Sequence, residues 1–149
     1  MRNKSGHPGR PRGFDRQEAL GRAQRLFRRH GYEAVSIAKL TDEIGIAPPS
    51  LYAAFGSKAE LFREAVLSYR ADDGIAPVKC TGTGQDRVRA SLLRSIEVVT
   101  HDKTTPGCMI STGMLTAAPE NETLAREVRE HRNAFRKQVE RWIQGDVAA

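Results

Sequence analysis

The sequence is poor in cysteine and in long apolar runs, and each shortage excludes a class of protein. Its 149 residues hold two cysteines, Cys80 and Cys108, which form no C-x-x-C motif. Two such cysteines predict neither a disulfide framework nor a zinc site. No stretch approaches the ~18–20 continuous apolar residues of a membrane-spanning helix. Because no apolar run follows the basic N-terminus, we expect no secretory signal and a protein of the reducing cytoplasm.

The common catalytic motifs are missing as well. The sequence contains no G-x-S-x-G, no H-E-x-x-H, no P-loop and no glycine-rich dinucleotide fingerprint. Its four histidines are scattered, with no paired carboxylates at ligand spacing. We therefore predict a protein that is not an enzyme and that needs no metal or cofactor. Strand-like alternation of apolar and polar residues is nearly absent, which favours an all-α fold.

The most informative pattern lies at residues 36–62, where two glycines separate three short helical segments. One face of the first segment carries apolar residues at helical spacing, namely Ile37, Leu40 and Ile44. Gly45 ends this segment, because glycine adopts a positive φ without a Cβ clash. Pro48 suits the first position of the next helix, where its missing N–H costs nothing. Two helices joined by a glycine turn predict a helix-turn-helix, a motif whose second helix can enter the major groove of DNA.

The rest of the chain predicts further helices and one break. We expect helices over residues 15–30, from 58 onward after an S-x-x-E capping box, over 85–100, over 107–117 and over 120–143. The segment 72–84 is rich in glycine and is the best candidate for a domain boundary. The 85–100 helix has one apolar stripe: Val88, Leu92, Leu93, Ile96 and Val99. The 107–117 helix is apolar on most sides and is expected to be buried.

Positive charge is concentrated at one end of the chain. The whole sequence carries a net charge of +6, and residues 1–31 alone hold nine lysines and arginines against two acidic residues. The remainder is close to neutral. This asymmetry is typical of a protein that meets a polyanion with one end, although a solvated basic tail has the same composition. Beside a helix-turn-helix, it favours a nucleic acid.

The order and spacing of seventeen residues point to a known family. These residues are Ala23, Leu26, Phe27, Gly31, Tyr32, Ser36, Ile37, Ala38, Ile44, Gly45, Ser50, Leu51, Tyr52, Phe55, Ser57, Lys58 and Leu61. Together they resemble the TetR/AcrR family of bacterial transcriptional repressors, closely over residues 15–70. More loosely, the run from Gly107 to Pro119 is similar to the segment that opens the ligand-binding half in some members.

The resemblance implies an all-α protein with a three-helix DNA-binding head, a connecting fourth helix and a helical regulatory body. It implies a homodimer that binds a palindromic operator in double-stranded DNA, is released by a small-molecule inducer and needs no membrane. We expect a disordered basic arm at 1–14, the DNA-binding domain at 15–70 and a partial ligand-binding and dimerisation domain at 71–149. Relatives usually continue into two more long helices that form the dimer's four-helix bundle. From this difference we expect the chain to be a truncated product, to dimerise differently, or not to dimerise.

Several residues are candidates for DNA contact. Arg10 and Arg12 lie on a short extended strip, from which arginines enter a narrow minor groove or contact phosphates nonspecifically. Ser36 suits both a helix cap and a phosphate contact at the positive end of the helix dipole. Lys39 is expected on the exposed side of the same helix, either facing DNA or solvated.

The recognition helix at 48–55 supplies the remaining candidates. Pro49, Ser50, Tyr52 and Ala53 are expected on its exposed side, and Lys58 is expected to face the same phosphates. In relatives the tyrosine that matches Tyr52 contacts the DNA backbone. Because arginine, asparagine and glutamine, the usual base readers, are scarce here, we expect apolar contacts and DNA shape to carry much of the specificity. Ala47 leaves this helix without a side-chain cap, which costs about 1 kcal/mol.

The second half suggests what the protein senses. The resemblance places a ligand among apolar side chains of the later helices. An apolar stripe can also be ordinary core, so both interpretations stay open for these residues. The candidates are Leu92, Ile96, Met109, Met114, Leu115 and Phe135. Two alternatives stay open. One is a thiol-based redox sensor that uses Cys80 or Cys108. The other is an architectural protein that binds DNA through charge alone, without sequence preference.

Overall fold

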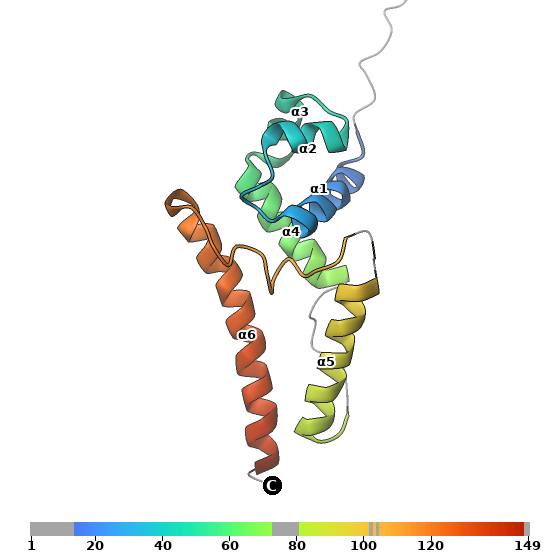
Figure 1. The fold of residues 1–149 in the computed structure, drawn as a ribbon, viewed down its shortest axis with the longest axis vertical. Helices are drawn as coiled ribbons and strands as arrows, with labels where there is room; N and C mark the ends of the chain where they lie inside the picture. Colours follow the sequence, from blue (N-terminus) through green and yellow to red (C-terminus); the bar gives the residue numbers. More distant parts are fainter. Residues whose placement is uncertain (1–13, 73–80, 102, 104, 148–149) are drawn as a thin grey trace, which may run out of the picture.

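The computed structural model describes residues 14–72, 81–101, 103 and 105–147, and in this part of the chain the structure is helical without strands. The elements are α1 (Arg16–His30), α2 (Ile37–Ile44), α3 (Pro48–Phe55), α4 (Lys58–Asp72), α5 (Gly84–His101), the 3₁₀ turn η1 (Pro119–Asn121) and α6 (Glu122–Val147). In Figure 1, α1 to α3 gather at one end and α4 leads away from them. Helices α5 and α6 run antiparallel at the other end. The predicted all-α fold is confirmed.

The first four helices begin and end where the sequence predicts, because their stop and start signals are local. The Asp15 side chain accepts hydrogen bonds from the first turn of α1. The Ser36 hydroxyl accepts from the Lys39 amide at 3.1 Å, so that α2 is capped. Gly45 follows α2 in the left-handed region, with φ 81° and ψ 35°. The Ser57 hydroxyl accepts from the Glu60 amide at 3.1 Å and begins α4.

Helices α1 to α3 form the head of the protein, and an aromatic cluster lies between this head and α4. The rings of Phe27 and Phe62 meet edge to face with centroids 5.0 Å apart. Tyr32 packs on Phe62 at 5.0 Å and on Phe27 at 6.1 Å. Edge-to-face pairs add about 0.5–1.5 kcal/mol to the burial of the rings themselves. The cluster therefore fixes α1 and α4 against each other, and these helices support α2 and α3.

The segment 107–117 is buried only in part, with Leu115 exposed, and it is not a helix. It forms a series of turns between α5 and η1. Gly107 has φ 115° and Met114 has φ 55°, and both values are incompatible with a right-handed helix. The carbonyls of Ile110 and Gly113 instead accept hydrogen bonds from Arg132 Nη1 of α6, at 2.9 and 3.0 Å. A side chain that is distant in sequence thus replaces the backbone ladder that a helix would supply.

Three residues of the predicted apolar stripe of α5 face outward in this structure, whereas Val99 packs against the core. Leu92, Leu93 and Ile96 are 56–58% exposed, whereas Ser91 and Val98 are buried. The helix itself is predicted correctly, but only part of its predicted apolar stripe is packed. The predicted last helix also begins later than expected, because Pro119 starts a 3₁₀ turn and α6 follows from Glu122.

Candidate nucleic-acid interface

Helices α2 and α3 form the predicted helix-turn-helix. The turn starts at Gly45, whose amide donates to the Thr41 carbonyl at 2.9 Å, and the Ile46 amide donates to the same carbonyl at 3.0 Å. Leu51 of α3 is fully buried and Phe55 is 5% exposed. These two residues attach α3 to the head by one side and leave its other side free.

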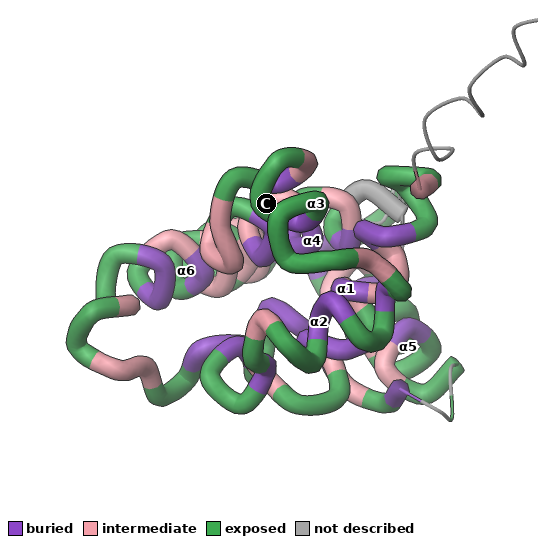
Figure 2. Tube along the Cα trace, turned by 90° about the horizontal axis from the view of Figure 1, so that it is seen from above, coloured by how far each residue is buried: buried purple, intermediate pink, exposed green. Residues whose placement is uncertain are grey.

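The free side of α3 carries the predicted contact residues. Pro49, Ser50, Tyr52 and Ala53 are all exposed, and Tyr52 keeps 47% of its surface accessible. Figure 2 shows how much of α3 is exposed compared with the helices beneath it. An exposed tyrosine offers a hydroxyl to a phosphate and a ring to a sugar or a thymine methyl group.

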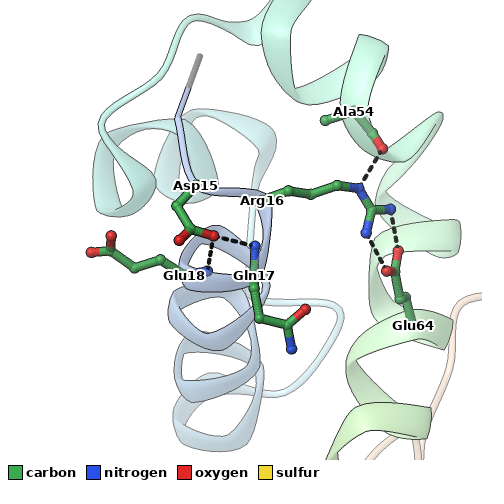
Figure 3. A network of polar contacts seen from close by, with 6 residues as sticks. All are labelled: Asp15, Arg16, Gln17, Glu18, Ala54 and Glu64. Carbon is green, nitrogen blue, oxygen red and sulfur yellow. Dashed lines mark hydrogen bonds and ion pairs between the residues drawn. The ribbon is translucent and has the colours of Figure 1, made fainter. Parts of the chain in front are cut away.

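Arg16 fixes the carboxyl end of α3. Its Nε donates to the Ala54 carbonyl at 3.2 Å, and Nη1 and Nη2 form a bidentate pair with Glu64 of α4 at 2.5 and 2.7 Å (Figure 3). The guanidinium also lies 4.6 Å from the centroid of the Phe55 ring. It satisfies a carbonyl that the helix leaves unpaired at its end, and it places positive charge at the negative end of the helix dipole.

Arg22 does the same for α2. Its Nη1 donates to the Glu43 carbonyl at 3.0 Å, while Nη2 pairs with Glu18 at 2.7 Å. A third arginine of α1, Arg28, donates through Nη2 to the Gly107 carbonyl at 3.3 Å. The predicted basic end is therefore less available to a polyanion than its charge suggests, because three of its arginines make contacts within the protein. Of these contacts, the sequence predicts only the Glu18–Arg22 pair, because these two residues lie four positions apart on one helix.

The start of α3 lacks a side-chain cap, as predicted. Pro48 and Pro49 occupy the first two helical positions and have no N–H to satisfy. The Ser50 amide donates to the Ala47 carbonyl at 2.9 Å. Few amides remain for a cap to satisfy, so the expected cost of about 1 kcal/mol for an uncapped helix is reduced here.

The candidates on α2 and α4 differ in their availability. Ser36 and Lys39 are exposed at and near the start of α2. Lys58 is partly buried, and its ammonium lies 4.1 Å from the centroid of the Tyr32 ring. Burial lowers the Lys58 pKa, and the nearby Glu33 carboxylate opposes this shift. In this structure the ammonium faces an aromatic ring of the head, so its phosphate contact stays a prediction.

Other predicted residues lie elsewhere or outside the description. Arg10, Arg12 and Cys80 fall outside the described residues, as does the arm at 1–13. Cys108 is buried, and its sulfur accepts from the Ser111 amide at 3.4 Å. Among the described residues, no group of histidine, cysteine or acidic side chains is placed to hold a metal ion. The helices of the described ranges are all too short or too polar to cross a membrane.

The structure separates the predicted ligand residues. Met109 and Met114 are buried core, while Leu92, Ile96 and Leu115 are exposed. A cavity of about 440 Å³ opens instead between α4, the segment around Ile110 and α6. Of the predicted residues, this cavity is lined by Phe135 alone. The apolar pattern identified candidates by type, but it could not show which of them face a common space.

Contacts between the head and the later elements went unpredicted. Glu33, in the α1–α2 loop, accepts from the Ala118 amide at 2.9 Å and from Asn121 Nδ2 at 3.0 Å. Arg63 of α4 pairs with Glu127 of α6 at 2.6 Å. These contacts join the two predicted domains, whose boundary stays a prediction.

Comparison with known proteins decides the family. Residues 19–65 match the family described as bacterial regulatory proteins, tetR family. A solved structure of the TetR family transcriptional regulator CifR, a cysteine mutant complexed with 26-bp double-strand operator DNA, is 38% identical. It superposes with a TM-score of 0.81 over 94% of this chain and 78% of that chain. The chain belongs to the TetR family. A second CifR mutant bound to operator DNA gives 37% identity and a TM-score of 0.79, over 91% of this chain and 74% of that one.

Two curated relatives described as HTH-type transcriptional repressors come from Escherichia coli K12. The HTH-type transcriptional repressor BdcR is 52% identical over 68 residues, which make up 46% of this chain and 34% of BdcR. The HTH-type transcriptional repressor ComR is 34% identical over 125 residues, 81% of this chain and 60% of ComR. This TetR family chain thus spans 34% and 60% of the lengths of these two relatives.

Proposed function

We propose that the protein is a DNA-binding transcriptional repressor that binds an operator as a homodimer and is released by a small-molecule inducer. The observation that carries the proposal is the exposed side of α3, held outward by buried Leu51 and Phe55 on one side and by Arg16 at its end. The similarity to CifR bound to operator DNA supports the same docking side. We infer that the operator is palindromic.

The α2–α3 unit suits the major groove. Tyr52, Ser50 and Ala53 present a hydroxyl-bearing and apolar surface, without a bidentate base reader. The exposed Ser36 lies at the start of α2, where the positive end of the helix dipole favours a phosphate. We infer that phosphate contacts position the protein and that DNA shape adds specificity. Arg10 and Arg12 remain predicted minor-groove or phosphate contacts.

The test is titration of the protein against its own upstream DNA and against random DNA at several salt concentrations. A repressor prefers the upstream site by about 10³-fold or more, and its footprint is symmetric. A charge-only architectural protein gives a steep salt dependence and no preference, and that result would contradict the proposal.

Two substitutions test the docking side. Tyr52→Ala is expected to weaken operator binding about tenfold, while Tyr52→Phe separates the hydroxyl from the ring. Lys58→Ala is expected to weaken operator binding and to make the binding constant less dependent on salt concentration. Lys137→Ala, which removes an exposed lysine of α6, is the matched control. Unchanged binding of both Tyr52→Ala and Lys58→Ala would remove the proposed docking side. Peroxide treatment that leaves operator affinity unchanged would exclude the redox-sensing alternative.

A further inference from the structure

The cavity beside α6 combines apolar walls with an unusual set of charges. Its volume of about 440 Å³ falls within the range of small-molecule sites. Ile110 and Trp142 are buried and Phe135 is partly buried, and together they give the cavity an apolar wall. The wall is built by α6 and by the turn segment that Arg132 holds in place.

Among the described residues, the ionisable side chains that line this cavity are all basic. They are Arg70 of α4 and His131, Arg132 and Arg141 of α6, and no aspartate or glutamate of the described residues lines the cavity. This is unlike the outer surface of α6, where Arg129 pairs with Glu122 and Arg136 with Glu140. The basic groups of the cavity meet neutral partners instead. Arg132 donates to two carbonyls, and Arg141 donates to Gln138 Oε1 at 2.5 Å.

Arg70 and His131 form the most informative pair. Arg70 Nη1 lies 3.1 Å from His131 Nδ1. Because a guanidinium only donates, Nδ1 must accept, so the imidazole is neutral and carries its proton on Nε2. Burial lowers the His131 pKa and the Arg70 charge lowers it further, while the Glu130 and Glu127 carboxylates oppose this shift. In the described part of the chain, the guanidinium groups of the cavity thus face His131, backbone carbonyls and Gln138 beside an apolar wall, an arrangement that a bound anion would stabilise.

We propose that this cavity binds an amphipathic organic anion, a carboxylate on an aryl or alkyl body, and that such an anion is the class of inducer. The guanidinium groups that line the cavity receive the carboxylate, with Arg70 and Arg141 as the candidates, and the apolar body lies against Phe135 and Trp142. This inference rests on the proposed function, because it names the inducer of the proposed repressor. The charge set favours an anion over a neutral ligand, and a volume of about 440 Å³ is of the size that holds a small molecule.

Trp142 makes the proposal directly testable. It is the one tryptophan of the chain and it lines the cavity. Titration of the 149-residue chain with 4-phenylbutyrate is expected to change tryptophan fluorescence saturably. The matched neutral ligand, 4-phenylbutyramide, is expected to bind about tenfold more weakly, since a charge-assisted hydrogen bond is lost. Equal binding of acid and amide, or no saturable change with the acid, would overturn the proposal.

Matched variants locate the site. Arg70→Gln and Arg141→Gln are expected to weaken phenylbutyrate binding about tenfold each. Arg136→Gln removes the same charge from the same helix as Arg141→Gln, but Arg136 does not line the cavity, so affinity should be unchanged. Equal effects of Arg136→Gln and Arg141→Gln would overturn the site. A fluorescence change that follows protein concentration without ligand would assign the cavity to a second copy and would also overturn it.

The two proposals can fail separately. Operator titration without ligand tests the repressor function alone, and phenylbutyrate titration without DNA tests the cavity alone. Operator binding without anion binding would overturn the inference and leave the repressor in place. Anion binding without operator binding would overturn the repressor. If phenylbutyrate binds but leaves operator affinity unchanged, the anion is not the inducer class and that part of the inference is wrong.

Discussion

At the scale of single residues, the arginines of α1 show where composition misleads. The charge count assigns them to a polyanion, yet Arg16 reaches Ala54 and Glu64, which are 38 and 48 residues away in sequence. A guanidinium has five donors in a rigid fork, so it suits carbonyls at helix ends and carboxylates as well as it suits phosphates. No local pattern reveals such partners, whereas exposure of Tyr52 follows from helical spacing around Leu51 and Phe55. The sequence therefore predicted which side of α3 is exposed, but it did not predict the Arg16 contacts that hold this helix in place.

Substitution of Arg16 separates support of α3 from contact with DNA. Arg16→Lys keeps the charge but loses the fork, so we expect it to lower the chemical denaturation midpoint nearly as much as Arg16→Gln. Arg25→Gln, on an exposed side chain of the same helix, is the control and should have little effect. If Arg16 served mainly as a phosphate contact, Arg16→Lys would retain both stability and operator affinity. That outcome would refute its role as the cap of α3.

At the scale of elements, prediction succeeded where the signals lie within a few residues of one another. Serine and aspartate caps, glycine stops and the Pro48 start are all local, and they place α1 to α4 correctly. The predicted helix over 107–117 is wrong, because Arg132 of α6 donates hydrogen bonds to carbonyls of this segment. The packed side of α5 was predicted only in part, since Val99 of the apolar stripe packs against the core and Ser91 is buried, whereas three other residues of the stripe are exposed.

The two helices of the motif should respond differently to their caps. Ser36→Ala removes the acceptor for the Lys39 amide and is expected to destabilise the fold by about 1 kcal/mol. Ala47→Ser adds an acceptor where Pro48 and Pro49 offer no N–H, so it should change stability by less than about 0.5 kcal/mol. Urea denaturation of both variants measures the contrast. A gain of about 1 kcal/mol from Ala47→Ser would show that the prolines do not replace the cap.

At the scale of the whole molecule, a few polar contacts connect the head to the helices beyond it. Glu33 reaches the start of η1, Arg28 reaches Gly107, and Arg63 pairs with Glu127 between α4 and α6. The cavity proposed for the inducer shares α4 and α6 with these contacts. A ligand that favours one placement of α6 would therefore also bias the position of α4 beneath the DNA-binding head. The sequence predicted the order of these parts but none of the contacts, because each joins residues far apart in the chain.

The Arg63–Glu127 pair gives this connection a pH dependence. Hydrogen bonding from Arg63 lowers the pKa of Glu127 below its ordinary value of 4.5. The folded state therefore favours the ionised carboxylate, and the stabilisation is present above about pH 4.5 and is lost as the pH falls through the lower folded pKa. Both side chains are 39% exposed, so solvent screening limits the contribution to about 0.5 kcal/mol. Glu127→Gln should thus destabilise the protein by about this amount at neutral pH and not at about pH 3.

The measurement is the difference in unfolding free energy between the wild type and Glu127→Gln from neutral to acid pH. Taking the difference removes the titration of every other carboxylate, which both proteins share. Glu130→Gln, on the exposed surface of the same helix, controls for the loss of one negative charge. The pair must also respond to Arg63→Gln, which should abolish the pH-dependent difference. A difference that stays constant down to about pH 3 would mean that Glu127 stabilises α6 by packing alone, and that the ion pair does not connect α4 to α6 energetically.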